Sequence, residues 1–220
     1  MSLAVLFDLD GTLLDSLADL AAAGNHVLRS HGFADHPVDA YRHFVGNGIE
    51  ILIRRILPIE QRDNDELATR ILAEFRARYA RAWNVRSHLY DGAMELLTEL
   101  RRRELPMAVL SNKPEDFTLL CVEHYLAEIP FVAVCGVTDQ RPRKPDPAGA
   151  LEIAGRTGIS PDCWVYLGDT ATDMQTARGA GMFPVGALWG FRDADELRQA
   201  GAERIIGQPM ALIDVIDHRS

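Results

Sequence analysis

The chain has 220 residues, of which 47% are hydrophobic and 25% are charged. This length fits one α/β domain with an insertion better than two equal domains, and the composition excludes a disordered chain, a collagen-like repeat or a small disulfide-stapled protein. The formal net charge of −9 disfavours binding to nucleic acid or to an anionic membrane, so an anionic ligand has to be held by a local cation.

The cysteines and the apolar runs indicate where the protein works. Cys121, Cys135 and Cys163 lie in or beside apolar segments, which is typical of free thiols in a reducing compartment. The N-terminal apolar run is broken by acids too early for a signal peptide, and no run reaches the roughly 18 residues of a membrane span. We therefore expect a cytoplasmic protein.

Short apolar runs alternate with helical patterns along most of the chain. The runs are residues 3–7, 106–110, 131–134, 164–167, 183–185 and 204–206, and the helical patterns cover residues 92–104, 114–127, 147–157, 172–180 and 209–217. Continuous apolar runs of this length are typical of strands buried on both faces of a parallel sheet. Their alternation with helices predicts βαβ units and an α/β fold class.

Residues 16–83 depart from this alternation because they show helical patterns only. Ser16 and Asp19 have the spacing of a capping box at the start of the first helix, and Gly46-Asn47-Gly48 has the composition of a turn. We predict a small α-helical cap domain at 16–83, inserted after the first strand of a core formed by 1–15 and 84–220. Open α/β sheets bind ligands at the carboxyl ends of their strands, so an insertion at this point is suited to act as a lid.

Polar side chains follow four of the predicted strands, at the edge where such sheets bind ligands. In chain order they are Asp8, Asp10, Thr12, Ser111, Asn112, Lys144, Asp169 and Asp173. Carboxylates gathered at one edge repel one another unless a cation lies among them. Oxygen ligands without cysteine or histidine favour Mg²⁺, which leaves coordination positions for a phosphate. The pattern predicts a phosphoryl-transfer site with a metal, oxyanion donors, a cation and a carboxylate nucleophile.

These residues carry a family resemblance. Asp8-Leu9-Asp10-Gly11-Thr12, Ser111-Asn112, Lys144 and Gly168-Asp169 with Asp173 resemble the four ordered motifs of the haloacid dehalogenase-like (HAD) superfamily. Leu13-Leu14-Asp15-Ser16, Val45-Gly46-Asn47-Gly48 and Ser111-Asn112-Lys113-Pro114 are similar to segments of phosphoglycolate phosphatases. The resemblance implies a HAD-like Rossmannoid core with a helical cap. It also implies Mg²⁺-dependent hydrolysis of a small phosphomonoester, with 2-phosphoglycolate as the first expectation. We expect a monomer or homodimer without nucleic-acid or membrane partners.

The resemblance also implies a role for each motif residue. Asp8 is the nucleophile that forms an aspartyl-phosphate, and Asp10 is the general acid and base. Mg²⁺ is held by the Asp8 carboxylate, the Asp10 backbone carbonyl and Asp169. The phosphoryl group is bound by Thr12, Ser111, Asn112 and Lys144. Asp173 steadies Lys144 or a metal-bound water. Apart from the resemblance, a functional interpretation of the Gly46-Asn47-Gly48 turn places the backbone N–H groups of Gly46 and Gly48 near a carboxylate of the substrate.

Several of these residues have a structural alternative. Thr170 and Asp173 have capping-box spacing, so Asp173 is also suited simply to start a helix. Lys144 lies near Arg141 and Arg143 and would fit a solvated basic loop. Gly46 and Gly48 are equally well explained as a helix–helix turn, because glycine tolerates positive φ.

Other functions remain open on the same residues. A β-phosphoglucomutase-like phosphoryl transferase shares the core and a helical cap, and pyrophosphate and nucleoside monophosphates are alternative substrates. A regulatory binding protein is the alternative that is not an enzyme. The second acid of the first motif, Asp10, separates phosphatases from haloacid dehalogenases, which lack it.

Overall fold

The structure, a computed structural model, describes residues 3–219. The larger of its two compact units is built around a six-stranded parallel sheet. The strands stand in the order β5-β4-β1-β6-β7-β8, and every neighbouring pair is parallel. They are β1 (Ala4–Phe7), β4 (Met107–Pro114), β5 (Phe131–Val137), β6 (Trp164–Gly168), β7 (Phe183–Ala187) and β8 (Arg204–Ile206). The predicted α/β fold with a parallel sheet is confirmed.

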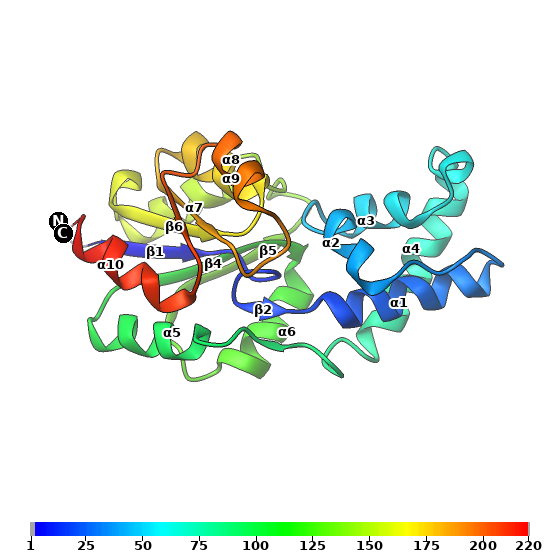
Figure 1. Cartoon of the computed structure of the whole chain (residues 1–220), viewed down its shortest axis with the longest axis horizontal. Helices are drawn as coiled ribbons and strands as arrows, with labels where there is room; N and C mark the ends of the chain where they lie inside the picture. The colour runs from blue at the N-terminus through cyan, green and yellow to red at the C-terminus, as the bar shows by residue number, and fades with distance from the viewer. Residues whose placement is uncertain (1–2, 220) are drawn as a thin grey trace. The chain divides into compact units, whose positions relative to one another are not determined.

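Helices cover both faces of this sheet (Figure 1). One face carries α5 (Ala93–Arg102), α6 (Glu115–Leu126) and α10 (Leu212–Asp217), and the other carries α7 (Ala148–Thr157), α8 (Ala171–Ala180) and α9 (Ala194–Gln199). Two short 3-10 helices, η3 (Pro161–Cys163) and η4 (Pro209–Ala211), join these elements. Because both faces are covered, every residue of β1 and β6 is buried, which explains their uninterrupted apolar sequences.

β1 lies where the connections of the sheet change direction. It pairs with β4 on one side and β6 on the other, so that Phe7 is level with both Val109 and Leu167. The crevice outside the carboxyl ends of strands at such a switch point is where open α/β sheets bind ligands. The residues that follow β1, β4 and β6 are therefore placed around one crevice.

β4 is longer than the apolar run that predicted it. The strand continues through the polar residues to Pro114, and its register against β5 shifts between Leu110 and Pro114 before pairing resumes at Pro114 and Val137. α6 begins at Glu115, one residue later than expected, with Pro114 as its N-cap. The prediction ended the strand at residue 110 because hydropathy alone does not register an irregular, polar continuation of a buried strand.

A second compact unit, Asp15–His88, is entirely helical apart from its ends. It contains α1 (Leu17–Ser30), α2 (Tyr41–Phe44), α3 (Ile49–Ile56) and α4 (Asp65–Ala80), with the 3-10 helices η1 (Val38–Ala40) and η2 (Ile59–Gln61). The two-residue strands β2 (Leu14–Asp15) and β3 (His88–Leu89) pair where the chain enters and leaves the unit. Within the unit, α4 contacts both α1 and α3.

The expected capping box at the start of α1 is wrong. Ser16 makes no side-chain capping bond. The Asp19 carboxylate is buried and accepts hydrogen bonds from the backbone N–H groups of Arg86 and Ser87, both at 2.9 Å, and from the Ser87 hydroxyl at 2.8 Å. Asp19 thus fastens the two ends of the helical unit to each other, and these hydrogen bonds satisfy its buried carboxylate.

The segment Gly46-Asn47-Gly48 is the turn between α2 and α3. Gly46 and Gly48 have φ angles of 107° and 87°, in the left-handed region that other residues seldom adopt. Gly48 is also the N-cap of α3. The turn interpretation of these glycines is therefore correct.

In the part of the chain that is described, no helix combines the length and the apolar character required to cross a membrane.

Candidate active site

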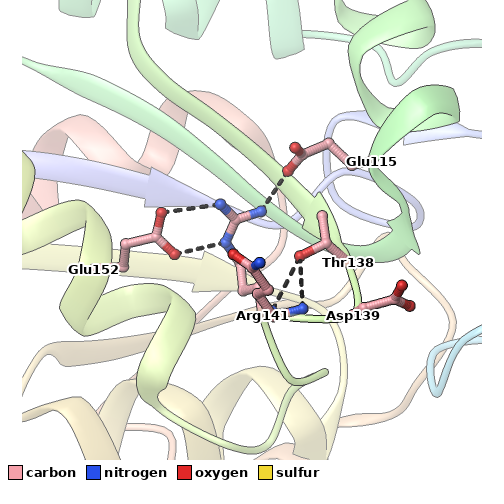
Figure 2. A pocket seen from close by; sticks show the side chains of 6 residues that line it. Glu115, Thr138, Asp139, Arg141 and Glu152 are labelled. Atoms are coloured by element: carbon pink, nitrogen blue, oxygen red, sulfur yellow. Dashed lines mark hydrogen bonds and ion pairs between the residues drawn. The ribbon is translucent and has the colours of Figure 1, made fainter.

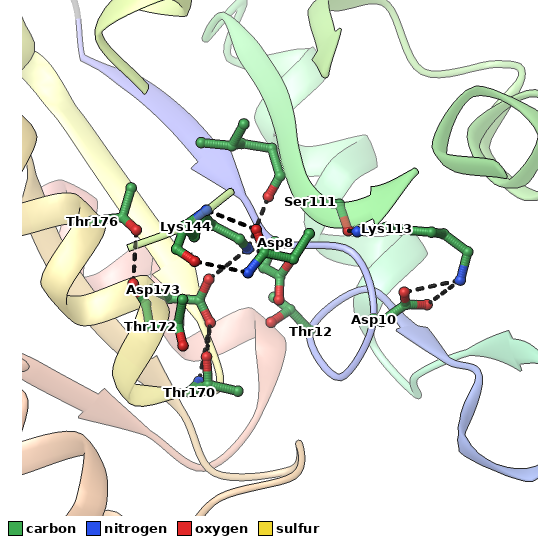
Figure 3. A network of polar contacts seen from close by, with 12 residues as sticks. Asp8, Asp10, Thr12, Ser111, Lys113, Lys144, Thr170, Thr172, Asp173 and Thr176 are labelled. Atoms are coloured by element: carbon green, nitrogen blue, oxygen red, sulfur yellow. Dashed lines mark hydrogen bonds and ion pairs between the residues drawn. The ribbon is translucent and has the colours of Figure 1, made fainter. Parts of the chain in front are cut away.

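Lys144 is at the centre of a buried group of carboxylates at the carboxyl ends of the strands (Figure 3). Its ammonium Nζ lies 2.7 Å from Asp8 Oδ1 and 2.7 Å from Asp173 Oδ1, and it donates to the Leu110 carbonyl at 3.1 Å. The side chain is 3% exposed. The alternative of a solvated basic loop is therefore wrong for Lys144.

Asp173 acts in two ways at once. Its Oδ2 accepts hydrogen bonds from the backbone N–H and hydroxyl of Thr170, at 3.0 and 2.7 Å, at the start of α8. Its Oδ1 contacts Lys144. The Asp173 carboxylate therefore caps α8 and also contacts Lys144, since one carboxylate has enough acceptor capacity for both.

Asp169 follows β6 and is completely buried. Its carboxylate accepts hydrogen bonds from the Thr12 hydroxyl at 3.1 Å and from the backbone N–H of Phe191 at 2.8 Å. Gly190 makes this contact available, because a Cβ on Gly190 would lie only 2.3 Å from both Asp169 Cβ and the Gly11 carbonyl oxygen. The loop after β7 therefore closes one side of the site.

Burial and neighbouring charges together set the ionisation of this group. Desolvation raises the pKa of Asp8 well above its ordinary value, with the charge of Asp173 adding to it and Lys144 opposing it. Burial, followed by the charge of Asp173, raises the pKa of Asp169 to about 7. For Lys144, burial lowers the pKa, but the charges of Asp173 and Asp8 outweigh it and the pKa is raised well above normal. One ammonium does not neutralise three buried carboxylates, so the site favours a further cation.

A metal ion fits these donors. Asp8, Asp169 and Asp173 are all buried, and each offers a carboxylate oxygen within 4.8 Å of the others. A set made of oxygen ligands suits hard divalent cations. The third carboxylate of this set, beside those of Asp8 and Asp169, is that of Asp173. The Asp10 carboxylate is not in this set, and it pairs with Lys113.

Asn112 and Ser111 hold the backbone around Lys144 and Lys113. The Asn112 side chain accepts from the Lys144 N–H at 2.7 Å and donates to the Lys144 carbonyl at 3.1 Å, so it clamps the Lys144 loop to β4. The Ser111 hydroxyl accepts from the Lys113 N–H at 3.2 Å. Both side chains are buried, beside the residues that carry the charge of the site.

Asp10 pairs with a lysine that was not among the predicted site residues. Lys113 Nζ lies 2.9 Å from each of the two carboxylate oxygens of Asp10. The Lys113 side chain is 3% exposed and that of Asp10 is 18% exposed. Figure 3 shows this pair to one side of the group formed by Asp8, Lys144 and Asp173.

Sequence reasoning also missed the loop after β7. The indole N–H of Trp189 in this loop donates to the Thr12 carbonyl at 2.9 Å. The loop that carries Trp189, Gly190 and Phe191 follows the carboxyl end of a parallel strand, as the motif residues do. Applying the same rule to this strand end would have found it.

Comparisons with known proteins show which family this chain is similar to. A sequence model of the haloacid dehalogenase-like hydrolase family matches residues 5–187. A phosphoglycolate phosphatase of Pseudomonas putida is 34% identical over 212 residues, which are 95% of this chain and 78% of that protein. One of Vibrio vulnificus is 31% identical over 217 residues, which are 96% and 95% of the two chains.

Solved structures give the same result. A crystal structure of a candidate phosphoglycolate phosphatase from Lactobacillus delbrueckii subsp. bulgaricus has a TM-score of 0.91 and 30% identity, covering 98% of this chain and 99% of that chain. A hydrolase from Pseudomonas syringae has a TM-score of 0.80 and 26% identity, covering 99% of both chains.

The chain belongs to the haloacid dehalogenase-like hydrolase family. Within the family it is similar to phosphoglycolate phosphatases over nearly its whole length, and it is a phosphoric monoester hydrolase. Hydrolases of this family are generally metal-dependent, in agreement with the buried carboxylate triad.

Proposed function

We propose that the protein is a Mg²⁺-dependent phosphatase that hydrolyses 2-phosphoglycolate through an aspartyl-phosphate on Asp8. The observation that carries this proposal is the buried contact of Lys144 with Asp8 and Asp173, next to Asp169, at the carboxyl ends of the central strands. The relatives named phosphoglycolate phosphatase support the substrate. The three free, buried cysteines support a cytoplasmic location.

In the first step, a carboxylate oxygen of Asp8 attacks the phosphorus, and the bond from phosphorus to the ester oxygen breaks. Asp10 donates its proton to the departing oxygen, so glycolate leaves as the alcohol. The contact of Lys144 with Asp8 supports this step, because an ammonium at 2.7 Å favours the ionised carboxylate that attacks.

In the second step, water attacks the phosphorus of the aspartyl-phosphate while Asp10 takes a proton from it. The bond between phosphorus and the Asp8 oxygen breaks, so inorganic phosphate leaves and the Asp8 carboxylate is restored. The same residue thus serves as acid and then as base.

The phosphoryl oxygens are bound in this proposal by Thr12, Ser111, Asn112 and Lys144. The hydroxyls and the N–H groups around them donate hydrogen bonds, and Lys144 supplies positive charge. The Asn112 side chain holds the Lys144 backbone, which supports a positioning role for Asn112 within this set.

Mg²⁺ is assigned to Asp8, Asp169 and the backbone carbonyl of Asp10, with Asp173 as support. The buried oxygen-only donor set and the raised pKa of Asp169 support a divalent cation there. When bound, Mg²⁺ supplies positive charge against the carboxylates and the phosphoryl oxygens.

The helical segment 16–83 is proposed as the cap that selects substrates, with Gly46 and Gly48 contacting the substrate carboxylate. The positive φ angles of both glycines support this proposal, because a bulkier residue does not adopt that backbone conformation easily. Replacing either glycine with valine is expected to reorder the ranking of substrates more than it lowers the general reaction. Equal losses on every phosphomonoester would remove the cap from substrate selection.

The test is phosphate release across a panel of 2-phosphoglycolate, sugar phosphates, nucleotides and pyrophosphate, with Mg²⁺ and with EDTA. Asp8→Asn is measured beside Asp139→Asn, a matched loss of one charge at an exposed position. We expect metal-dependent release, highest on 2-phosphoglycolate, that Asp8→Asn abolishes and Asp139→Asn leaves intact. Retention of more than a few per cent of turnover in Asp8→Asn rejects the nucleophile, and interconversion of sugar phosphates without phosphate release identifies a mutase.

A further inference from the structure

Lys113 is a buried cation in the proposed site whose task is not covered by the reaction steps. It comes from the polar continuation of β4 and holds both carboxylate oxygens of Asp10 at 2.9 Å. Lys144 contacts Asp8 and Asp173 instead. The two ammonium groups therefore serve two different sides of the site, one with the nucleophile and one with the acid and base.

The choice of residue type is unusual for this chain. Among its 23 lysines and arginines, only Lys113 and Lys144 are lysines. Its other ion pairs use arginine or histidine, as in Arg103 with Asp217 or Arg141 with Glu152. A compact ammonium occurs at the strand ends that form the site, where a bulky, planar guanidinium would occupy more of the space a small substrate needs.

Geometry places Lys113 on the side of the leaving group. Asp10 has to come within about 2.6–3.2 Å of the ester oxygen to exchange its proton with it. Since Lys113 Nζ is 2.9 Å from both Asp10 oxygens, an ester oxygen bound to one of these oxygens would lie at most about two hydrogen-bond lengths from the ammonium. In an ester of an α-hydroxy acid, the carboxylate carbon is two bonds from that oxygen.

We infer that Lys113 binds a carboxylate of the leaving group and so selects phosphomonoesters of small α-hydroxy acids. This inference rests on the proposed function, with Asp10 as the acid at the ester oxygen. An ammonium carries three N–H donors and is suited to contact a second carboxylate beside Asp10. Without Lys113, the Asp10 carboxylate would lose its paired cation and would repel an anionic leaving group.

A purely structural role for the Lys113 pair makes a different prediction. If Lys113 only holds Asp10 in place, its loss lowers the rate for every phosphomonoester by the same factor. If it binds the leaving group, the loss is larger for a substrate that carries a carboxylate, and it appears mainly in KM.

The experiment compares kcat/KM for 2-phosphoglycolate and 2-phosphoglycolamide, in which an uncharged amide replaces the carboxylate. The proteins are wild type, Lys113→Gln, Lys113→Arg and the control Arg103→Gln, which removes a cation that pairs with Glu99 and Asp217. We expect wild type to prefer the anionic substrate and Lys113→Gln to reduce that preference about tenfold or more, as for loss of a hydrogen bond to a charged group. Lys113→Arg should keep part of the preference, and Arg103→Gln all of it.

An equal fall on both substrates in Lys113→Gln overturns the inference and leaves a positioning role. If the glutamine variant does not fold, the wild-type ratio and Lys113→Arg decide, and a wild-type ratio near one overturns the inference. Release of phosphate from uncharged esters with no preference for the carboxylate rejects the inference alone. Release from no phosphomonoester rejects the proposed function as well.

Discussion

Arg141 and Lys144 lie three residues apart in the loop between β5 and α7, and each contacts two carboxylates. Arg141 pairs with Glu115 and Glu152 beside a polar pocket of about 540 Å³ (Figure 2). Lys144 pairs with Asp8 and Asp173. The arrangements look alike, but the carboxylates around Arg141 are about a third exposed, whereas those around Lys144 are buried.

This difference in burial reverses the effect on the carboxylates. The hydrogen bond from Arg141 lowers the pKa of Glu152 against a smaller effect of burial, so Glu152 stays ionised without further help. At Asp8 burial is the largest influence and the pKa rises. A pair near water is satisfied and structural, while a buried group with excess negative charge is suited to bind a cation and to do chemistry.

Lys144→Met is expected to have the largest effect, and its result would sharpen this comparison. We expect phosphatase activity to fall about a hundredfold or more, as for other groups that stabilise charge in a transition state. Stability should fall by about 3–5 kcal/mol, since Asp8 and Asp173 lose their buried partner. Phosphate release and urea unfolding measure the two effects. Wild-type activity in this variant would contradict the proposed difference between the ion pairs of Lys144 and those of Arg141.

Gly190→Ala tests how tightly the buried cluster is enclosed. The new Cβ would meet Asp169 Cβ and the Gly11 carbonyl at 2.3 Å, so we expect a loss of about 1–3 kcal/mol from overpacking together with reduced phosphate release.

The matched control is Gly155→Ala in α7, where a Cβ meets nothing within 4 Å. Alanine should stabilise that helix by about 0.5–1 kcal/mol and leave activity unchanged. If both variants behave alike in thermal unfolding and in activity, Gly190 is not part of the enclosure of Asp169.

Arg141→Met should have a smaller effect than Lys144→Met. Its ion pairs are partly exposed, so we expect a loss of up to about 1 kcal/mol for each of the two pairs in urea unfolding, with activity close to wild type. An activity loss as large as that of Lys144→Met would show that the polar pocket takes part in the reaction.

The smallest effect is a pH dependence at Glu152. Its pKa in the folded protein is lowered from 4.5 by Arg141, so its contribution to stability is complete above pH 4.5 and is lost as the pH falls through the lower folded value. Because Glu152 is partly exposed, Glu152→Gln should cost less than about 1 kcal/mol at pH 7. Unfolding curves of the variant and wild type should converge as the pH falls below 4.5, and a gap that widens in acid would have the wrong sign.

Much of the fold follows from local patterns. The alternation of buried runs and helical patterns predicts the parallel strands because each signal is carried by neighbouring residues. The exceptions depend on distant contacts. Asp19 has the spacing of a cap but bonds Arg86 and Ser87, and β4 continues to Pro114 because pairing with β5 resumes there.

The site divides in the same way. The sequence predicts that Asp8, Lys144, Asp169 and Asp173 meet, because each follows a parallel strand and such strand ends share one edge. The pairing of Lys113 with Asp10 was not predicted, since the chain between them contains the whole helical unit and no local pattern records the contact.

The sequence by itself determined the fold class and the family, because hydrophobic periodicity and ordered motifs are properties of neighbouring residues. Only the tertiary structure decided which cation serves which carboxylate: Lys144 with Asp8 and Asp173, Lys113 with Asp10, and Arg141 with Glu115 and Glu152. It also decided which of these pairs is buried. Charge interactions depend on distance and on exclusion of water, and both arise only when distant segments pack together.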